Sequence, residues 1–125
     1  LYIFTELAAE GDLALKIASE GKQPEAKVKI WFKQLISALE HCHSQRVFHR
    51  DVKLENLLLS GSNAKLADFG LAVISPESQV IKDRVGTPAY VPPEVISGFG
   101  YDPAPADIWS SGIALYTLLI GSEFL

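Results

Sequence analysis

Apolar side chains recur at three- and four-residue steps from Val28 to Cys42, and this spacing predicts an amphipathic helix of about five turns. Pro24 suits the first turn of that helix. A shorter helix is expected before it, because Asp12 can cap a helix that runs to about Ser19 and Gly21 would end it. The apolar positions of the longer helix are Val28, Trp31, Phe32, Leu35, Ile36, Leu39 and Cys42.

The longest apolar stretch, Ile108 to Ile120, lies near the end of the chain and contains several small polar residues. It falls short of the roughly 18–20 residues that a membrane span requires, so it predicts a buried helix over residues 106–120. Gly121 would end that helix. Residues 93–96 are expected to form one further helical turn. The polar stretch 75–85 is expected to be mobile.

Strands are expected to be few and short. Leu1 to Thr5 is rich in β-branched and aromatic residues and predicts a strand. Val47-Phe48 is long enough only for a strand fragment. The runs 57–59 and 64–67 flank Ser60-Gly61-Ser62-Asn63 and predict a hairpin. The expected fold is therefore mainly α with short β hairpins.

The composition allows one domain with a modest core: the chain has 125 residues and 48% of them are hydrophobic. The formal net charge of −4 argues against a nucleic-acid partner, because phosphate binding needs a basic face. The single cysteine, Cys42, cannot form an internal disulfide, which fits a reducing, cytoplasmic compartment. We expect no signal peptide, since Leu1 to Phe4 lacks a basic leader, and no membrane partner. We expect both ends to be cuts through a larger domain.

The candidate chemistry concentrates in two blocks, His49 to Asn56 and Asp68-Phe69-Gly70. Together they hold two carboxylates, a lysine and an asparagine in a fixed order. Phosphoryl transfer from a metal-bound nucleotide to a hydroxyl needs such a set. One carboxylate receives the hydroxyl proton, while the other carboxylate and an amide oxygen hold magnesium. The predicted hairpin joins the two blocks, so we expect Asp51 and Asp68 to face one cleft.

The first block resembles the catalytic loop of eukaryotic protein kinases, and the second resembles their magnesium loop. Gly86 to Glu94 is similar to the end of the kinase activation segment, with Pro92-Pro93-Glu94 where the family usually has Ala-Pro-Glu. Asp107 to Gly112 resembles the start of the long buried helix of the large lobe. The resemblance covers nearly all of residues 1–125. It implies an incomplete C-terminal (large) lobe of the protein-kinase-like fold, from the hinge strand to that helix.

This resemblance implies ATP and Mg²⁺ as cofactors and assigns the catalytic roles. Asp51 orients the attacking hydroxyl and accepts its proton. Lys53 reaches the transferring phosphate, and Thr87 contacts both Asp51 and Lys53. Asn56 and Asp68 supply the oxygen ligands of magnesium.

The same resemblance places the nucleotide against the start of the chain. Backbone groups of the hinge, Glu6 to Ala8, meet the adenine, and Leu58 lies under the ring; plain core packing of Leu58 is compatible with this. Asp12 lies near the ribose, and Asp12 with Glu55 favours arginine upstream of the acceptor residue. The implied nucleotide-binding set is Glu6, Ala8, Asp12, Lys53, Glu55, Asn56, Leu58 and Asp68.

Lys53 together with Gly86-Thr87-Pro88 resembles the serine/threonine branch, so the expected partners are proteins with Ser or Thr acceptors. The closest group is that of the calcium/calmodulin-dependent and AMP-activated kinases. Arg50 directly precedes Asp51. In the resembling family, an arginine at this position usually pairs with a phosphorylated threonine of the activation segment, and Asp83 occupies the place of that threonine here. We hypothesise that Asp83 offers Arg50 a permanent, weaker anion. The alternative is a loop aspartate without that role.

The histidines and Asp107 favour structural roles. In the resembling family, the histidine at His49 packs beside the Phe69 position and braces the backbone, which we favour over a general base. His41-Cys42-His43 point in different directions on a helix, so they cannot converge on one metal ion. Asp107, expected to open the last helix, is either an ordinary N-terminal helix charge or the family's buried aspartate that holds the catalytic-loop amides.

Two other functions stay open from the sequence. A pseudokinase or scaffold module would keep the shape and bind partners, although all four catalytic-loop and magnesium-loop residues are present. A metal-dependent hydrolase built on Asp51, His49 and Asp68 fits less well, because such sites gather more histidines or carboxylates.

Residues 1–125 contain no G-x-G-x-x-G loop and no strand lysine with a partner glutamate. We therefore expect this stretch alone to be nearly inactive and marginally stable.

Overall fold

The computed structural model describes residues 1–76 and 80–122. Its elements, in chain order, are α1 (Leu13–Glu20), α2 (Glu25–Ser44), β1 (Val47–Phe48), the 3₁₀ turn η1 (Leu54–Asn56), β2 (Leu57–Ser60), β3 (Asn63–Leu66), β4 (Val73–Ile74), α3 (Pro93–Ser97) and α4 (Pro103–Ile120). The prediction of a mainly α fold with short β hairpins is confirmed for the described residues.

The first two helices begin and end where local signals predict. Asp12 is the N-cap of α1, and its Oδ1 accepts a hydrogen bond from Leu15 N at 2.8 Å. Gly21 closes α1 with φ 71°, a left-handed conformation that favours glycine. Pro24 precedes α2, whose predicted apolar stripe is confirmed: its buried residues are Val28, Trp31, Leu35 and Leu39.

Helix α4 begins at Pro103, three residues earlier than predicted. Prolines suit a first helical turn because the N–H groups there have no intrahelical partner, and Asp102 caps the turn through Ala104 N at 3.0 Å. The expectation that Asp107 opens this helix is therefore wrong, since Asp107 lies inside it. None of the helices formed by the described residues is long and apolar enough to cross a membrane.

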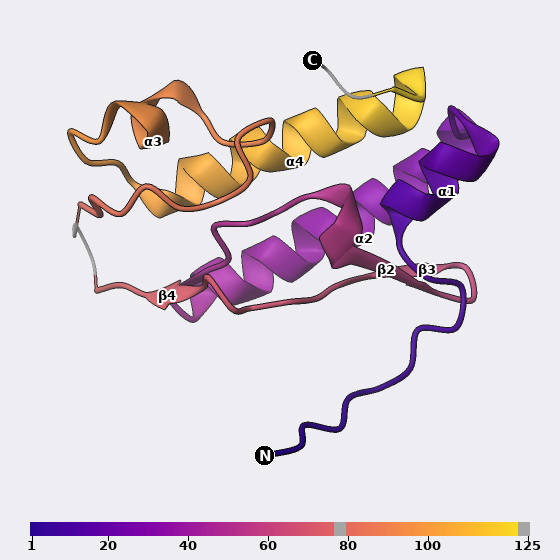
Figure 1. Cartoon of the computed structure of the whole chain (residues 1–125), viewed down its shortest axis with the longest axis horizontal. Helices are drawn as coiled ribbons and strands as arrows, with labels where there is room; N and C mark the ends of the chain where they lie inside the picture. The colour runs from indigo at the N-terminus through magenta and orange to yellow at the C-terminus, as the bar shows by residue number, and fades with distance from the viewer. Residues whose placement is uncertain (77–79, 123–125) are drawn as a thin grey trace.

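The predicted hairpin is confirmed as β2 paired antiparallel with β3, with Leu57 opposite Leu66 and Ser60 opposite Asn63. The turn is tighter than predicted, because Ser60 and Asn63 belong to the ladder and Gly61 turns the chain with φ 61°. The fragment β1 pairs antiparallel with β4. The strand predicted over Leu1 to Thr5 is wrong: these residues are exposed and pair with none of the described residues. Figure 1 shows this segment, in indigo, extending away from the helices.

The stretch 75–85 is less exposed than its polar composition predicts. Ser75 is buried and its N–H donates to Arg46 O at 3.1 Å. Ile81 is buried too, and it exchanges two backbone hydrogen bonds with Tyr101 at 3.0 and 2.9 Å. Residues 77–79, within this stretch, lie outside the described residues. Ser75 and Ile81 are thus packed on the body of the molecule, whereas residues 82–84 are exposed.

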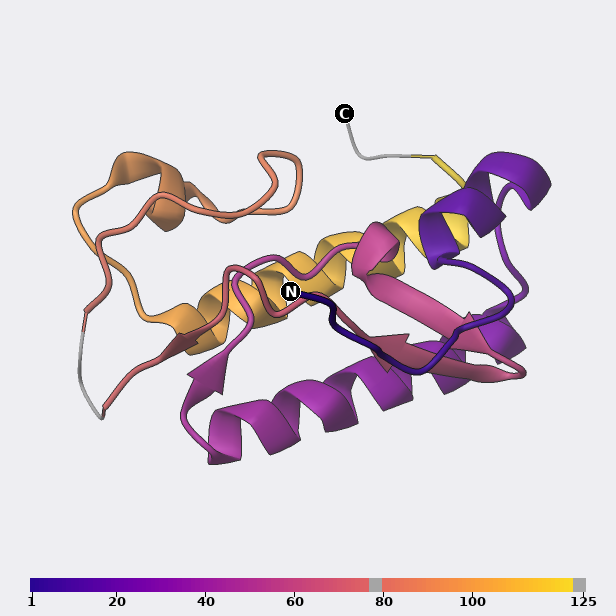
Figure 2. The same cartoon turned by 60° about the horizontal axis from the view of Figure 1, so that its bottom comes forward.

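The main core lies between α2, α4, α1 and the β2–β3 hairpin. Helices α2 and α4 lie side by side, and the loop from β1 to η1 runs along α4 (Figures 1 and 2). A second, smaller core beneath α3 contains Ile81, Val95, Tyr101 and Ala106. Val52 and Leu54 hold the loop that carries the candidate chemistry in the main core, so this loop does not stand free in solvent.

Candidate active site

Asp51 is the centre of a hydrogen-bond cluster in the loop between β1 and η1. Its Oδ1 accepts from Thr87 Oγ1 at 2.7 Å, and its Oδ2 lies 3.1 Å from Lys53 Nζ and 3.3 Å from Asn56 Nδ2. Burial raises the pKa of Asp51, but the hydrogen bonds from Thr87, Lys53 and Asn56 outweigh burial and leave the pKa below its usual value. Asp51 is therefore an ionised acceptor at neutral pH.

Thr87 joins the segment that follows the Asp68 block to this cluster. Lys53 Nζ donates to Thr87 Oγ1 at 2.9 Å, while the Thr87 hydroxyl donates to Asp51. The prediction that Thr87 contacts both Asp51 and Lys53 is confirmed. The Thr87 hydroxyl thus holds the Asp51 carboxylate and the Lys53 ammonium together, although Thr87 belongs to a different segment of the chain.

Asn56, at the end of η1, is buried and has one orientation that satisfies its partners. Its Nδ2 donates to Asp51 O at 2.8 Å as well as to Asp51 Oδ2. Because both partners are acceptors, the amide nitrogen must face Asp51, which turns the amide oxygen to the opposite side. That oxygen is a hard ligand of the kind Mg²⁺ prefers.

The Asp68 block is attached to the same loop by its neighbours. Ala67 N donates to Asn56 O at 2.9 Å, and Ala67 O lies 2.9 Å from His49 Nε2. Asp68 has a left-handed backbone with φ 59°, and its exposed carboxylate accepts from Gly70 N at 3.1 Å. A Cβ at position 70 would lie 3.0 Å from Asp68 Oδ1, so a side chain there would crowd the carboxylate.

The donor set fits magnesium better than a transition metal. Among residues 1–76 and 80–122, no three His, Cys, Asp or Glu side chains are close enough to hold a metal ion alone. Mg²⁺ is usually bound by one or two protein oxygens together with phosphates and water. The Asn56 amide oxygen and the Asp68 carboxylate would hold it in this chain.

His49 is a structural residue with a defined tautomer. It is fully buried, its Nδ1 accepts from Asp51 N at 3.2 Å, and its Nε2 therefore carries the hydrogen that bonds to Ala67 O. The Phe69 ring packs edge-on against the imidazole, with centroids 4.8 Å apart. The expected packing of His49 beside Phe69 is confirmed, and both imidazole nitrogens are occupied by backbone groups.

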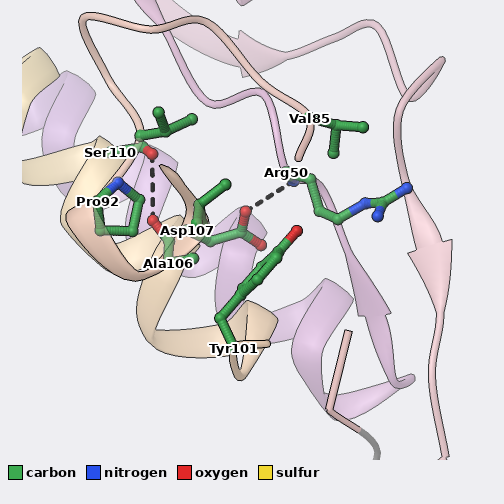
Figure 3. A pocket seen from close by; sticks show the side chains of 9 residues that line it. Arg50, Val85, Pro92, Tyr101, Ala106, Asp107 and Ser110 are labelled. Atoms are coloured by element: carbon green, nitrogen blue, oxygen red, sulfur yellow. Dashed lines mark hydrogen bonds between the residues drawn. The ribbon is translucent and has the colours of Figure 1, made fainter. Parts of the chain in front are cut away.

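Asp107 holds the loop from the side of α4. Its side chain is 1% exposed, and it accepts hydrogen bonds from His49 N at 2.9 Å and from Arg50 N at 2.8 Å. Of the two interpretations of Asp107, the structure therefore selects the buried aspartate that holds the catalytic-loop amides. Figure 3 shows the bond to Arg50, with the Tyr101 hydroxyl beside it in a small pocket that Ser110 also lines.

Arg50 extends from the same loop toward the segment before Thr87. Its Nε donates to Leu71 O at 2.7 Å, and its Nη1 lies 3.1 Å from Asp83 Oδ2. The Arg50 side chain is 9% exposed, whereas that of Asp83 is 67% exposed. The hypothesised pair between Arg50 and Asp83 is present, although its effect on activity stays a prediction.

The residues predicted to meet the nucleotide lie around the β2–β3 hairpin. Asp12 forms a β-bridge with Leu58, which is half-buried on β2. Leu58 pairs across the hairpin with Lys65, whose side chain makes an ion pair with Glu6. Asp12, Leu58 and Glu6 are thus brought together at one side of the hairpin.

Ala8 and Glu55, the remaining residues predicted to bind the nucleotide, lie in other surroundings. Ala8 O accepts a 3.4 Å bond from Gly11 N, which turns the chain toward α1. Glu55 is exposed on η1, whereas Asn56, the next residue, is buried. The Asp12 carboxylate, which caps α1 through Oδ1, retains Oδ2 for a ligand.

The roles of three residues of this region were not predicted from the sequence. His43 Nε2 lies 2.8 Å from Asp107 Oδ2, and Ser110 Oγ donates to Tyr90 O at 2.9 Å. Gly86 has φ 109°, and a Cβ there would lie 2.8 Å from Arg50 O, so glycine permits this close approach. The signal for His43 was available, because it follows Leu39 by four residues on the buried stripe of α2.

Comparison with known proteins adds an independent finding. The family model described as protein kinase domain matches residues 1–125. CBL-interacting protein kinase 24 of Oryza sativa subsp. japonica is 47% identical over 123 residues, which cover 97% of this chain and 27% of that protein. CBL-interacting serine/threonine-protein kinase 24 of Arabidopsis thaliana is 44% identical over 123 residues, covering 97% of this chain and 28% of that protein.

A third relative, CBL-interacting serine/threonine-protein kinase 16 of Arabidopsis thaliana, is 48% identical over 132 residues and covers 97% of this chain. The chain spans little more than a quarter of the length of these three relatives. The match to the family model includes the loop from His49 to Asn56, Asp68 and Thr87.

Proposed function

The chain belongs to the protein kinase domain family, and on that premise we propose that the complete protein is a serine/threonine kinase. It would transfer the γ-phosphate of ATP to a Ser or Thr hydroxyl of a protein substrate. The observation that carries this proposal is the cluster of Asp51, Lys53 and Thr87, in which an ionised carboxylate and an ammonium are held by one hydroxyl.

Asp51 would receive the substrate hydroxyl. Its lowered pKa keeps it ionised, and ionised carboxylate oxygens can accept the hydrogen of that hydroxyl while aiming its oxygen for attack. The hydrogen bonds from Thr87 and Asn56 leave the carboxylate one preferred orientation. Positioning of this kind is the main requirement, because the transition state of phosphoryl transfer is loose.

Lys53, Asn56 and Asp68 would meet the phosphates. The Lys53 ammonium has three donors on a flexible stem, so it can keep Asp51 and Thr87 while following charge on the transferring group. Asn56 and Asp68 would present their oxygens to the metal. When bound, Mg²⁺ would supply positive charge that neutralises the phosphates.

The nucleotide base would lie beside the β2–β3 hairpin. Leu58, half-buried on β2, would offer an apolar surface to the ring, and it lies two residues after Asn56. Glu6 and Ala8 would contribute backbone groups, and Asp12 would accept from the ribose. Asp12 and the exposed Glu55 would favour arginine upstream of the acceptor.

We further propose that residues 1–125 alone do not phosphorylate peptides at a measurable rate. Kinases cover the nucleotide phosphates with a glycine-rich loop and pair them with a strand lysine. Neither feature occurs in this stretch. Peptide phosphorylation by a purified 1–125 chain would contradict this part of the proposal.

The test is phosphate transfer from labelled ATP to Ser, Thr and Tyr peptides by the complete protein. The Asp51→Asn variant should lose about a hundred-fold or more in kcat, because the hydroxyl loses its base. Asp102→Asn is the matched control: Asp102 is an exposed N-cap of α4, asparagine also caps helices, and activity should not change.

The same preparations separate a kinase from a scaffold that keeps the shape. Stabilisation by ATP that requires Mg²⁺, together with labelled Ser or Thr peptide, supports the kinase. Equal transfer by Asp51→Asn and the unsubstituted protein would refute the assignment of Asp51. Absence of transfer by a folded, nucleotide-binding protein would refute the proposed activity.

A further inference from the structure

An exposed arginine lies on the end of α3 and takes no part in the proposed chemistry. Arg84 Nη2 donates a hydrogen bond to Ser97 O at 3.0 Å, and Ser97 is the last residue of α3. The last carbonyl groups of a helix have no intrahelical partner, so a cationic side chain is a suitable donor there. Among the described residues, Ser97 O is the one hydrogen-bond partner of this guanidinium. The contact therefore attaches the segment that follows the Asp68 block to α3.

Gly98 leaves the space that the guanidinium occupies. A Cβ at position 98 would lie 2.6 Å from Arg84 Cζ, and closer still to Nε and Nη2. A side chain at position 98 would therefore displace the end of the Arg84 side chain. Gly98 also has φ 73°, a left-handed conformation that favours glycine, and it closes α3. The missing side chain thus allows both the end of α3 and the contact with Arg84.

Helix α3 is a firm support for this contact. Its Val95 is buried in the smaller core, together with Ile81, Tyr101 and Ala106. Since Ala106 belongs to α4, this core fastens α3 to the start of α4, and Figure 1 shows the two helices next to each other. A group bonded to the end of α3 is therefore held in place relative to α4.

The contact holds the chain just before Thr87. Arg84 precedes Thr87 by three residues, which span at most about 10–11 Å even when fully extended. Gly86, between them, has φ 109°, and a Cβ there would lie 2.8 Å from Arg50 O, so this connection has little room to adjust. A displacement of Arg84 should therefore reach the Thr87 hydroxyl, which donates to Asp51 at 2.7 Å.

Arg84 acts on a different side of the segment from its neighbour Asp83. Asp83 pairs with Arg50 of the catalytic loop, whereas Arg84 bonds to α3. Two consecutive residues thus attach the chain before Thr87 to two separate parts of the molecule. Each attachment can be removed without changing the residues of the other.

We propose that Arg84 is a positioning residue for phosphoryl transfer, which keeps the Thr87 hydroxyl on Asp51 through its contact with the end of α3. The effect on catalysis rests on the proposed kinase activity, whereas the effect on Thr87 does not. Arg84 forms no hydrogen bond with any described residue assigned to the nucleotide. Loss of the contact should therefore lower kcat and leave the KM for ATP unchanged.

The experiment removes the contact from each side in the complete protein. Arg84→Met removes the donors and keeps an apolar stem, whereas Gly98→Ala keeps Arg84 but fills the place of its guanidinium. Lys82→Met is the control for the loss of an exposed positive charge. Gly61→Ala is the control for Gly98→Ala, because Gly61 also has a positive φ, of 61°, and nothing lies within 4 Å of an added Cβ. A variant that combines Arg84→Met with Gly98→Ala completes the cycle.

For each variant we would measure kcat, the KM values for ATP and peptide, Tm, and the NMR order parameter of the Thr87 methyl group. Arg84→Met and Gly98→Ala should each lose about three- to ten-fold in kcat, the effect of one net hydrogen bond, and their Thr87 methyl groups should be more mobile. The combined variant should lose no more than either single one, because both remove the same contact. Gly61→Ala should lower Tm about as much as Gly98→Ala but, like Lys82→Met, should keep kcat and the Thr87 order parameter.

Several outcomes would overturn the inference. One is an Arg84→Met protein with unchanged kcat and an unchanged Thr87 order parameter. Losses that multiply in the combined variant would show two separate causes, and an equal loss in Lys82→Met or Gly61→Ala would show an effect of charge or backbone strain. A change in the KM for peptide alone would place Arg84 in substrate binding. If Gly98→Ala does not fold, Arg84→Met decides; should the complete protein transfer no phosphate at all, the Thr87 order parameter decides.

Discussion

The ion pair between Arg50 and Asp83 leads to a direct prediction about regulation. Replacement of Asp83 by alanine in the complete protein removes the only carboxylate that contacts the Arg50 guanidinium among the described residues. Arg50 keeps its bond to Leu71 O, so the guanidinium is not left wholly unpaired. The loop from Asp83 to Thr87 loses its charged attachment to the catalytic loop, and Thr87 is thereby less firmly held beside Asp51.

The magnitude follows from the exposure of the two side chains. Arg50 is 9% exposed, but Asp83 is 67% exposed, so solvent screens the pair on one side. Pairs of this kind contribute about 0.5–1 kcal/mol, toward the upper part of the range for surface ion pairs. If that energy stabilises only the active arrangement, its loss lowers kcat about two- to five-fold, since 1.36 kcal/mol corresponds to a factor of ten.

The assay is peptide phosphorylation by protein that carries no phosphate, verified by mass spectrometry. Asp83→Asn should behave like Asp83→Ala, because the charge rather than the shape is lost, and Lys82→Ala is the control on a neighbouring exposed residue. The difference from the unsubstituted protein should shrink when salt is raised from about 0.05 M to about 0.5 M. Unchanged activity of Asp83→Ala at low salt would refute the idea that Asp83 supplies a permanent anion.

Two further predictions concern the same segment. In Thr87→Val the pKa of Asp51 should rise, because burial remains and a hydrogen bond to the carboxylate is lost; the acid limb of the kcat/KM profile should then move to higher pH. Ionised Asp51 contributes stability above its unfolded pKa of about 3.9, and this stability is lost as pH falls through the lowered folded pKa. Because the folded pKa rises in Thr87→Val, the pH range between the folded and unfolded pKa values should narrow in that variant. Gly86→Ala should destabilise by about 1–3 kcal/mol in urea unfolding, since φ is 109° and the new Cβ would lie 2.6 Å from Val91 Cγ1. Gly112→Ala is its control, with nothing within 4 Å of the Cβ, and should be stabilising by about 0.5–1 kcal/mol; the reverse order would show that crowding does not decide the cost.

The elements that the sequence predicts best are those specified by neighbouring residues. Helix α1 needs only Asp12 as its cap and Gly21 as its end, and the hairpin needs only two apolar runs around Gly61. The block from His49 to Asn56 was likewise found from adjacent residues. Each of these signals lies within a few consecutive residues. The predicted elements are therefore present in the structure, and only their boundaries differ from the prediction.

The errors come from contacts between distant segments. Leu1 to Thr5 has strand composition, yet a strand also requires a hydrogen-bonded partner, which no nearby residue can specify. Ser75 looked like an exposed loop serine, but its burial depends on Arg46, far earlier in the chain. His43 looked like a polar residue at a helix end because Asp107 belongs to another helix.

Arg50 shows why a strained residue is stable at this point of the fold. A left-handed conformation costs about 1–2 kcal/mol in a residue with a side chain, whereas a hydrogen bond to a charged group contributes about 1.5–3 kcal/mol. The bond from Arg50 N to Asp107 is therefore sufficient to offset the strain, provided that the carboxylate stays in place. Arg50 also donates to Leu71 O and pairs with Asp83, and its carbonyl oxygen lies close to Gly86; these three partners belong to the segment that follows the Asp68 block. One side of Arg50 thus depends on α4 and the other on the segment that follows the Asp68 block, so a change on either side reaches Asp51 through a single strained residue.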